Sequence, residues 1–187
     1  MNLEFSGGTT TSIEGANGSG KSTLVRILAG LMQPVKGQVV LQVEGKEIDS
    51  EMRPLSCGLV APYLNVYDGF SPRENLEFIA KARRLSDVND KIEAVLDQVQ
   101  LLNRADDLVR TFSSGMLQRV RIATALLSNP PVLILDEPTA TLDTDGEEMV
   151  HAVITRAVYE GKIVIVATNE RAEAEACQFR INVEDFR

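Results

Sequence analysis

Cysteine and histidine are scarce in this chain of 187 residues. The two cysteines, Cys57 and Cys177, lie far apart and have no metal-ligand spacing, so the sequence predicts no cysteine-based metal site. We expect both to be reduced, mostly buried thiols of a cytoplasmic protein. The single histidine, His151, falls in a stretch with helical spacing, where we expect it to be structural or exposed.

Long apolar runs are also absent. No run approaches the ~20 residues that a membrane-spanning helix needs. Residues 1–8 lack the charged and apolar regions of a signal peptide. The hydrophobic content is 44%, which is enough for one sizeable core. We therefore expect one domain over residues 1–187, with a smaller helical lobe.

Positive charge is in the minority, because 19 lysines and arginines face 27 aspartates and glutamates, for a net charge of −8. A protein that binds the phosphate backbone of a nucleic acid shows a basic surface instead. Local basic clusters occur at residues 81–84 and 119–121, and the first is more typical of a solvated helix face. We expect no nucleic-acid partner.

The sequence does contain a complete phosphate-binding loop pattern, G-x-x-x-x-G-K-[ST]. The pattern is formed by Gly15, Ala16, Asn17, Gly18, Ser19, Gly20, Lys21, Ser22 and Thr23. Its glycines let the backbone curl so that successive N–H groups point at a β- and a γ-phosphate. The lysine places a point charge on those phosphates, and the hydroxyl of Ser22 can coordinate Mg²⁺.

The surroundings of this loop also fit. Residues 9–13 are a β-branched, strand-like run, and residues 22–31 have helical spacing. The expected buried face of that helix comprises Leu24, Val25, Ile27, Leu28 and Leu31. The loop is then placed at a helix N-terminus, where anions bind best.

A second polar element follows the apolar run Val132–Leu135, which is typical of a parallel strand buried on both faces. The run ends in Asp136 and Glu137, at the sheet edge where α/β folds bind ligands. Asp136 is a candidate Mg²⁺ ligand through water, and Glu137 is a candidate base for an attacking water.

Between these elements, residues 112–119 read Phe-Ser-Ser-Gly-Met-Leu-Gln-Arg. Ser113 is a good N-cap for a helix to about Leu127, and that N-terminus would present N–H groups to a γ-phosphate. The segment resembles the signature of ATP-binding-cassette (ABC) ATPases, usually Leu-Ser-Gly-Gly-Gln. Ser113 and Gly115 match this signature, whereas Phe112, Ser114 and Met116 depart from it.

The resemblance covers most of the chain. Residues 140–143 resemble the D-loop of ABC proteins, and the buried run 163–168 ends where the family has its switch loop. Residues 33–39 and the turn at Glu44-Gly45 resemble its antiparallel β layer. The predicted fold class is α/β, a P-loop NTPase core with a mainly parallel sheet, that antiparallel layer, and an inserted helical lobe at about 62–115.

Within this lobe, local signals predict two helices. Ser71, Pro72 and Glu74 form a capping box with proline at the first helical position, for a helix to about Leu85. Ser86 can cap the next helix, whose apolar residues recur with helical spacing. A short alternating strand is expected at 179–183.

Three features depart from the family. The switch position, normally histidine, is Asn169, and the Q-loop glutamine position falls on Pro62 or Tyr63. The first strand and the adenine-stacking aromatic have no clear counterpart, because Phe5 is close to Gly15.

The resemblance implies an ATPase subunit of an ABC transporter, with Lys21, Glu137 and Asn169 as catalytic residues. Two copies would enclose ATP between the phosphate loop of one and residues 113–115 of the other. One alternative is a soluble ABC-type ATPase that acts on DNA or the ribosome. Another is a catalytically degenerate nucleotide-binding module, which Asn169 and Pro62 favour and Glu137 argues against.

The implied cofactors are ATP and Mg²⁺, the latter held by Ser22 and Asp136. The implied partners are an integral membrane subunit and a second ATPase subunit, identical or not. That arrangement would place the chain in the cytoplasm, peripheral on the cytoplasmic face of the inner or plasma membrane. The phosphate loop and short chain are also similar to those of haem exporters of cytochrome c biogenesis.

Overall fold

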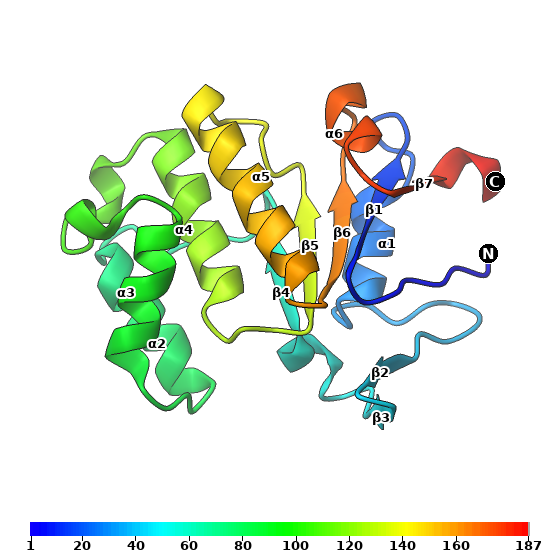
Figure 1. Cartoon of the computed structure of the whole chain (residues 1–187), viewed down its shortest axis with the longest axis horizontal. Coiled ribbons are helices and arrows are strands. Elements are labelled where there is room, and N and C mark those ends of the chain that lie inside the picture. The colour runs from blue at the N-terminus through cyan, green and yellow to red at the C-terminus, as the bar shows by residue number, and fades with distance from the viewer. Residues whose placement is uncertain (187) are drawn as a thin grey trace.

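A five-stranded parallel sheet forms the centre of the computed structural model, which describes residues 1–186 (Figure 1). The strand order is β4-β5-β6-β1-β7, and every neighbouring pair is parallel. The strands are β1 (Thr9–Glu14), β4 (Cys57–Val60), β5 (Val132–Asp136), β6 (Ile163–Ala167) and β7 (Phe179–Asn182). The runs predicted at residues 9–13, 132–135, 163–168 and 179–183 are present as β1, β5, β6 and β7, within one residue at each end, whereas β4 is not among the predicted strands.

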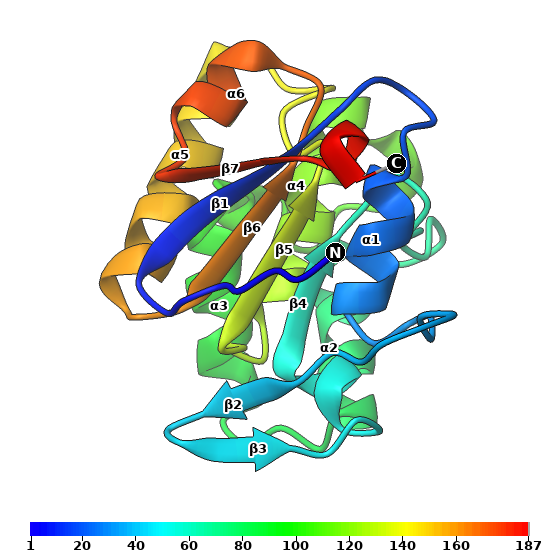
Figure 2. The same cartoon turned by 90° about the vertical axis from the view of Figure 1, so that its right-hand side faces the viewer.

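Both faces of this sheet are covered. The α-helices are α1 (Lys21–Leu28), α2 (Pro72–Ala82), α3 (Val88–Gln98), α4 (Ser114–Leu126), α5 (Thr144–Tyr159) and α6 (Arg171–Glu175). Figure 2 shows α1 on the near face of the sheet, with α3, α4 and α5 behind it. The remaining short elements are the 3₁₀ helices at Arg53–Ser56, Leu102–Arg104, Val109–Thr111 and Val183–Phe186.

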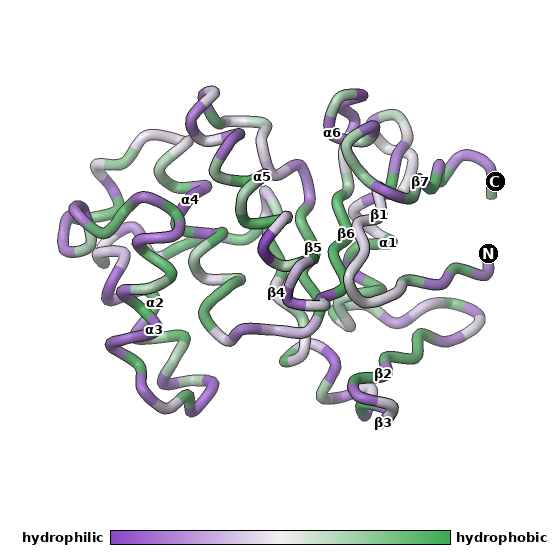
Figure 3. The backbone as a smooth tube through the Cα atoms, in the orientation of Figure 1, coloured by the Kyte–Doolittle hydropathy of each residue, from purple (hydrophilic) through white to green (hydrophobic). Residues whose placement is uncertain are grey.

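The core divides into two apolar clusters, one on each face of the sheet. Successive residues of β5 point to opposite faces, so Leu133 and Leu135 pack with α4 and α5, whereas Val132 and Ile134 pack with α1. All of β5 is buried, as a continuous apolar run predicts for a central parallel strand. Figure 3 shows this apolar centre in green.

Side chains cap the N-termini of α2, α4 and α5. The predicted capping box of α2 is present, with Ser71 Oγ accepting from Glu74 N and the Glu74 carboxylate accepting from Ser71 N. The predicted cap of α3 is wrong. Asp87, not Ser86, precedes this helix, and it takes a left-handed backbone conformation with no side-chain cap bond.

Two further expectations need correction. Leu31 is not on the buried face of α1, because the helix ends at Leu28 and Leu31 is 53% exposed. The antiparallel layer is a hairpin of β2 (Leu41–Val43) and β3 (Lys46–Ile48), and residues 33–39 form no strand. Positive φ angles of 51° and 75° at Glu44 and Gly45 fit the tight hairpin turn.

The two cysteines are free, Cys57 buried and Cys177 half-buried. Burial raises the pKa of the Cys57 thiol to about 11, against the opposing effect of the nearby arginines. Within residues 1–186, no helix combines the length and apolar character needed to cross a membrane.

Candidate functional site

Strand register brings the predicted site segments to one edge of the sheet. Ile13 of β1 and Asp136 of β5 both pair with Ala167 of β6, and Val60 of β4 pairs with Leu135. Because all the strands run parallel, their carboxyl ends meet at this edge. The segments that leave from it begin at residues 15, 61, 137 and 168.

The phosphate loop connects β1 to α1. Gly15 and Gly20 have φ angles of 147° and 108°, which residues with a side chain rarely adopt. A Cβ on Gly15 would also lie only 2.6 Å from Ser19 Oγ. Lys21 is 5% exposed, and its Nζ donates to Gly15 O at 2.7 Å, so its charge lies inside the curl of the loop. Gly20 precedes α1 with no side-chain cap bond, which suits an anion at that helix N-terminus.

Asp136 is the buried acid of the site. It is 1% exposed, and its Oδ2 has no hydrogen-bond partner. Burial raises the pKa of its carboxyl above the ordinary value, opposed mainly by the Ser22 hydroxyl. A buried, unpaired carboxylate oxygen beside a hydroxyl suits a hard cation such as Mg²⁺, which takes one or two protein ligands together with phosphates and water.

Glu137 follows with an uncommon backbone conformation. Its φ is 51°, in the left-handed region that non-glycine residues rarely adopt, and its N–H donates to Ala167 O at 2.8 Å. Such strain is typically concentrated at functional sites. This hydrogen bond to β6 fixes the backbone of Glu137 next to the end of that strand.

Asn169 lies against the phosphate loop. Its Nδ2 donates to Asn17 Oδ1 at 3.4 Å, although the two residues are 152 positions apart. The backbone before it is fixed as well, because Thr168 N–H donates to Ile13 O. The structure therefore brings Asn169 together with the phosphate loop, at the edge that carries Asp136 and Glu137.

The signature segment lies apart from these residues. Ser113 caps α4, its Oγ accepting from Met116 N at 3.3 Å, and Ser113 and Ser114 are exposed. They line a groove of about 520 Å³ together with Arg119, Thr141 and other residues. None of residues 15–23 lines this groove. In Figure 1, the start of α4 and the phosphate loop lie toward the same end of the molecule, on opposite sides of the sheet.

A polar chain that sequence reasoning missed connects α4 to this sheet edge. Gln118 Nε2 donates to Pro138 O at 3.0 Å, and its Oε1 accepts from Arg121, which in turn donates to Leu64 O. Gln118 is buried. A glutamine on an otherwise apolar helix face is the signal that could have indicated such a contact.

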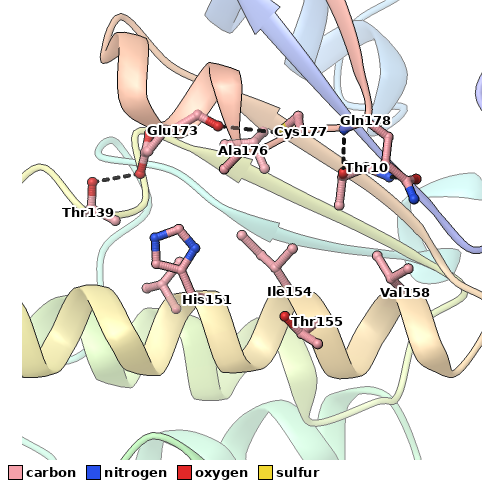
Figure 4. Close-up of a pocket in the computed structure, with 12 residues that line it drawn as sticks. Thr10, Thr139, His151, Ile154, Thr155, Val158, Glu173, Ala176, Cys177 and Gln178 are labelled. Carbon is pink, nitrogen blue, oxygen red and sulfur yellow. Dashed lines mark hydrogen bonds between the residues drawn. The ribbon is translucent and has the colours of Figure 1, made fainter.

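A second missed contact lies beside α5. Thr139 Oγ1 donates to Glu173 Oε1 at 2.6 Å and so ties the loop after Glu137 to α6 (Figure 4). The pocket in this view, about 240 Å³, also has His151 in its wall. His151 is exposed on α5, one of the two alternatives, structural or exposed, that the sequence predicts.

Phe5, considered from the sequence as an aromatic near the loop, is half-buried. It packs against the apolar cluster that contains Ile13 and Val25. Its ring is therefore used in packing on the α1 face.

Comparison with known proteins places this geometry in context. A family model described as "ABC transporter" matches residues 1–140. The uncharacterized ABC transporter ATP-binding protein YybJ of Bacillus subtilis (strain 168) is 31% identical over 174 residues, covering 92% of this chain and 78% of that protein. The Nod factor export ATP-binding protein I of Cupriavidus metallidurans is 32% identical over 177 residues, covering 94% of this chain but 58% of that protein.

Solved structures give the same picture. The dimeric structure of MJ0796, a bacterial ABC transporter cassette, has a TM-score of 0.85 at 28% identity, covering 97% of this chain and 83% of that one. A dimeric post-hydrolysis state of the same cassette, bound to ADP and Pi, has a TM-score of 0.83 at the same identity and coverage. The predicted fold class, a P-loop NTPase with a mainly parallel sheet and a small antiparallel one, is confirmed.

Proposed function

Because the chain belongs to the ABC transporter family, in which the cassette binds and hydrolyses ATP, we propose that it is the ATPase subunit of a membrane transporter. The observation that carries the proposal is the sheet edge itself. There a complete phosphate loop, the buried Asp136, the strained Glu137 and Asn169 leave from neighbouring parallel strands.

The proposed chemistry uses each group in turn. Lys21 and the backbone N–H groups of residues 15–23 hold the triphosphate. Glu137 accepts a proton from the water whose oxygen attacks the γ-phosphorus, and the bond from that phosphorus to the bridging oxygen breaks. The products are ADP and phosphate. Asn169 donates a hydrogen bond to a γ-phosphate oxygen as charge develops there.

Mg²⁺ is part of the proposal, with Ser22 and Asp136 as the residues that would hold it. The unpaired Asp136 Oδ2 supports this assignment. When bound, the ion would neutralise charge on the phosphates. Binding it would also give the buried carboxylate the partner that it lacks within the protein.

We propose that two cassettes act head to tail. The exposed N-terminus of α4, with Ser113, Ser114 and Gly115, lies in a groove that no phosphate-loop residue lines, so a second copy is needed to bring the two together. The dimeric MJ0796 structures support such an assembly. The second cassette can be identical or different.

The membrane partner is proposed from a surface feature. Tyr67, Phe70 and Phe78 form an exposed aromatic surface on α2 and the loop before it. The ring centroid of Tyr67 lies 5.5 Å from that of Phe70 and 5.2 Å from that of Phe78. Clustered exposed aromatics are typical of protein interfaces. We propose that an integral membrane subunit covers this aromatic surface and holds the chain on the cytoplasmic face. A haem exporter is one such partner, proposed from the phosphate-loop resemblance alone.

The test of catalysis replaces Glu137 with glutamine. Glu137→Gln should keep ATP binding but lower turnover by about 100-fold or more, because an amide cannot accept the proton. ATP should then trap a dimer that light scattering detects. The matched control is Glu148→Gln, an exposed glutamate on α5, which should hydrolyse ATP like the parent.

Unchanged hydrolysis in Glu137→Gln would refute the base assignment. A parent chain that binds ATP but shows no hydrolysis, alone or with its partner, would favour the degenerate nucleotide-binding module instead.

A further inference from the structure

Four buried side-chain polar atoms of the described residues have no hydrogen-bond partner: Ser19 Oγ, Arg53 Nε, Tyr63 Oη and Asp136 Oδ2. Arg53 still donates through its two other nitrogens. The remaining three atoms all belong to segments at the carboxyl edge of the sheet. An unpaired buried polar group costs about 1–3 kcal/mol, so a polar ligand bound at this edge would remove a cost that the protein alone leaves.

Ser19 and Asp136 belong to the proposed ATP site, but Tyr63 has no role there so far. Its position follows from strand register. Val60 pairs with Leu135, so Ala61 is level with Asp136, and Tyr63 leaves the sheet two residues beyond that row. This is the segment where the resemblance expects a glutamine.

The Tyr63 ring is held by a second contact. The guanidinium carbon of Arg26 lies 4.1 Å from the ring centroid, a cation–π geometry. Arg26 lies four residues after Ser22 on α1, hence on the same helix face. Its charge also acts on the Asp136 carboxyl, where it lowers the pKa against the larger effect of burial. The ring is therefore held against α1 by Arg26, one helical turn after Ser22.

We propose that the Tyr63 hydroxyl is a positioning group of the ATP site, which hydrogen-bonds to the Mg²⁺–triphosphate group while Arg26 fixes its ring. The inference rests on the proposed function. The hydroxyl can donate to a phosphate oxygen or accept from water bound to the ion. In either case the bond gives this buried hydroxyl the partner that the protein does not supply.

The test is Tyr63→Phe in the full chain, which removes the hydroxyl and keeps the ring over which Arg26 lies. The probe is a non-hydrolysable ATP analogue, titrated by calorimetry with Mg²⁺ and with a chelator. We expect affinity with Mg²⁺ to fall about tenfold, or ~1.4 kcal/mol. The melting temperature of the free protein should be unchanged or higher, because an unpaired polar group is removed. Tyr159→Phe, on a 92% exposed side chain of α5, should bind like the parent.

The two titrations distinguish the bonding partner. A loss only with Mg²⁺ identifies ion-bound water, and an equal loss in the chelator identifies a phosphate oxygen. If Tyr63→Phe binds the analogue like the parent in both titrations, the inference is overturned. This holds even if Arg26→Met weakens binding, because the ring and not the hydroxyl would then matter. A parent chain that does not bind the analogue at all overturns the proposed function instead.

Discussion

At the scale of single residues, Asn169 is where this chain departs most informatively from its family. An amide can hydrogen-bond a phosphate oxygen but carries no charge, and charged donors form bonds about twice as strong. We predict slow basal hydrolysis, a further drop of about tenfold in Asn169→Ala, and a gain in Asn169→His. Single-turnover hydrolysis at saturating ATP separates this chemical step from binding.

The contact with Asn17 gives this prediction a structural basis, because the amide already reaches the phosphate loop. Asn89→Ala, an exposed position on α3, is the matched control. If Asn169→Ala hydrolyses ATP as fast as the parent, Asn169 does not sense the γ-phosphate.

Asp136 illustrates the conflict between stability and function at one residue. Burial raises the pKa of its carboxyl, so folding favours the protonated form. The stability that depends on this protonation is complete below the ordinary pKa and is lost as pH rises through the raised pKa. Asp136→Asn should avoid that loss and stabilise the free protein at neutral pH by about 1 kcal/mol, or ~2–4 °C in melting temperature. Thermal unfolding between acidic and neutral pH measures it.

The same variant should lose the Mg²⁺-dependent part of ATP binding, which calorimetry detects. A melting temperature below that of the parent at neutral pH would contradict the proposed cost of burying this carboxylate. Asp145→Asn, exposed on α5, controls for the change in net charge.

Residues of the site differ in how far the sequence predicts them. The phosphate loop, Asp136 and Glu137 are predictable because each follows a strand-like run and belongs to a contiguous pattern. The run before the loop is β-branched, and the run before the two acids is apolar. Contacts between distant segments have no such pattern. The ring of Tyr63 under Arg26, and Thr139 against Glu173, depend on which strands are neighbours in the sheet.

At the scale of elements, prediction succeeds where local chemistry decides. The capping box before α2 and the Ser113 cap of α4 both lie in the sequence and both form. The start of α3 is different, because Asp87 takes a left-handed conformation without a cap bond. No serine-to-glutamate pattern marks that start. Packing of Ile92, Val95 and Leu96 therefore determines the helix more than its cap does.

Helix α4 is connected to two segments at the carboxyl edge of the sheet. Its N-terminus carries the signature serine, and its buried Gln118 contacts Pro138 O just after Glu137. Through Arg121 it also contacts Leu64 O, next to Tyr63. Contiguous hydrogen bonds therefore join α4 to the segment after Glu137 and to the loop that carries Tyr63.

At the scale of the whole molecule, the aromatic surface of Tyr67, Phe70 and Phe78 tests the transport proposal. Phe78→Ser should lower the amount of chain that copurifies with membranes by about tenfold, because a central aromatic at an interface contributes over 1 kcal/mol. Identification of the bound integral subunit by mass spectrometry names the partner. Tyr159→Ser, which removes a still more exposed aromatic from α5, outside the aromatic surface, should copurify like the parent.

The outcome discriminates between the function classes that the sequence leaves open. Phe78 is 47% exposed, so Phe78→Ser should change the free energy of unfolding by no more than about 0.5 kcal/mol. Parent-like copurification of Phe78→Ser would refute the assignment of this surface to a membrane subunit. Copurification with ribosomes or DNA in place of membranes would favour an ATPase of that class, whose partner must then tolerate a net charge of −8.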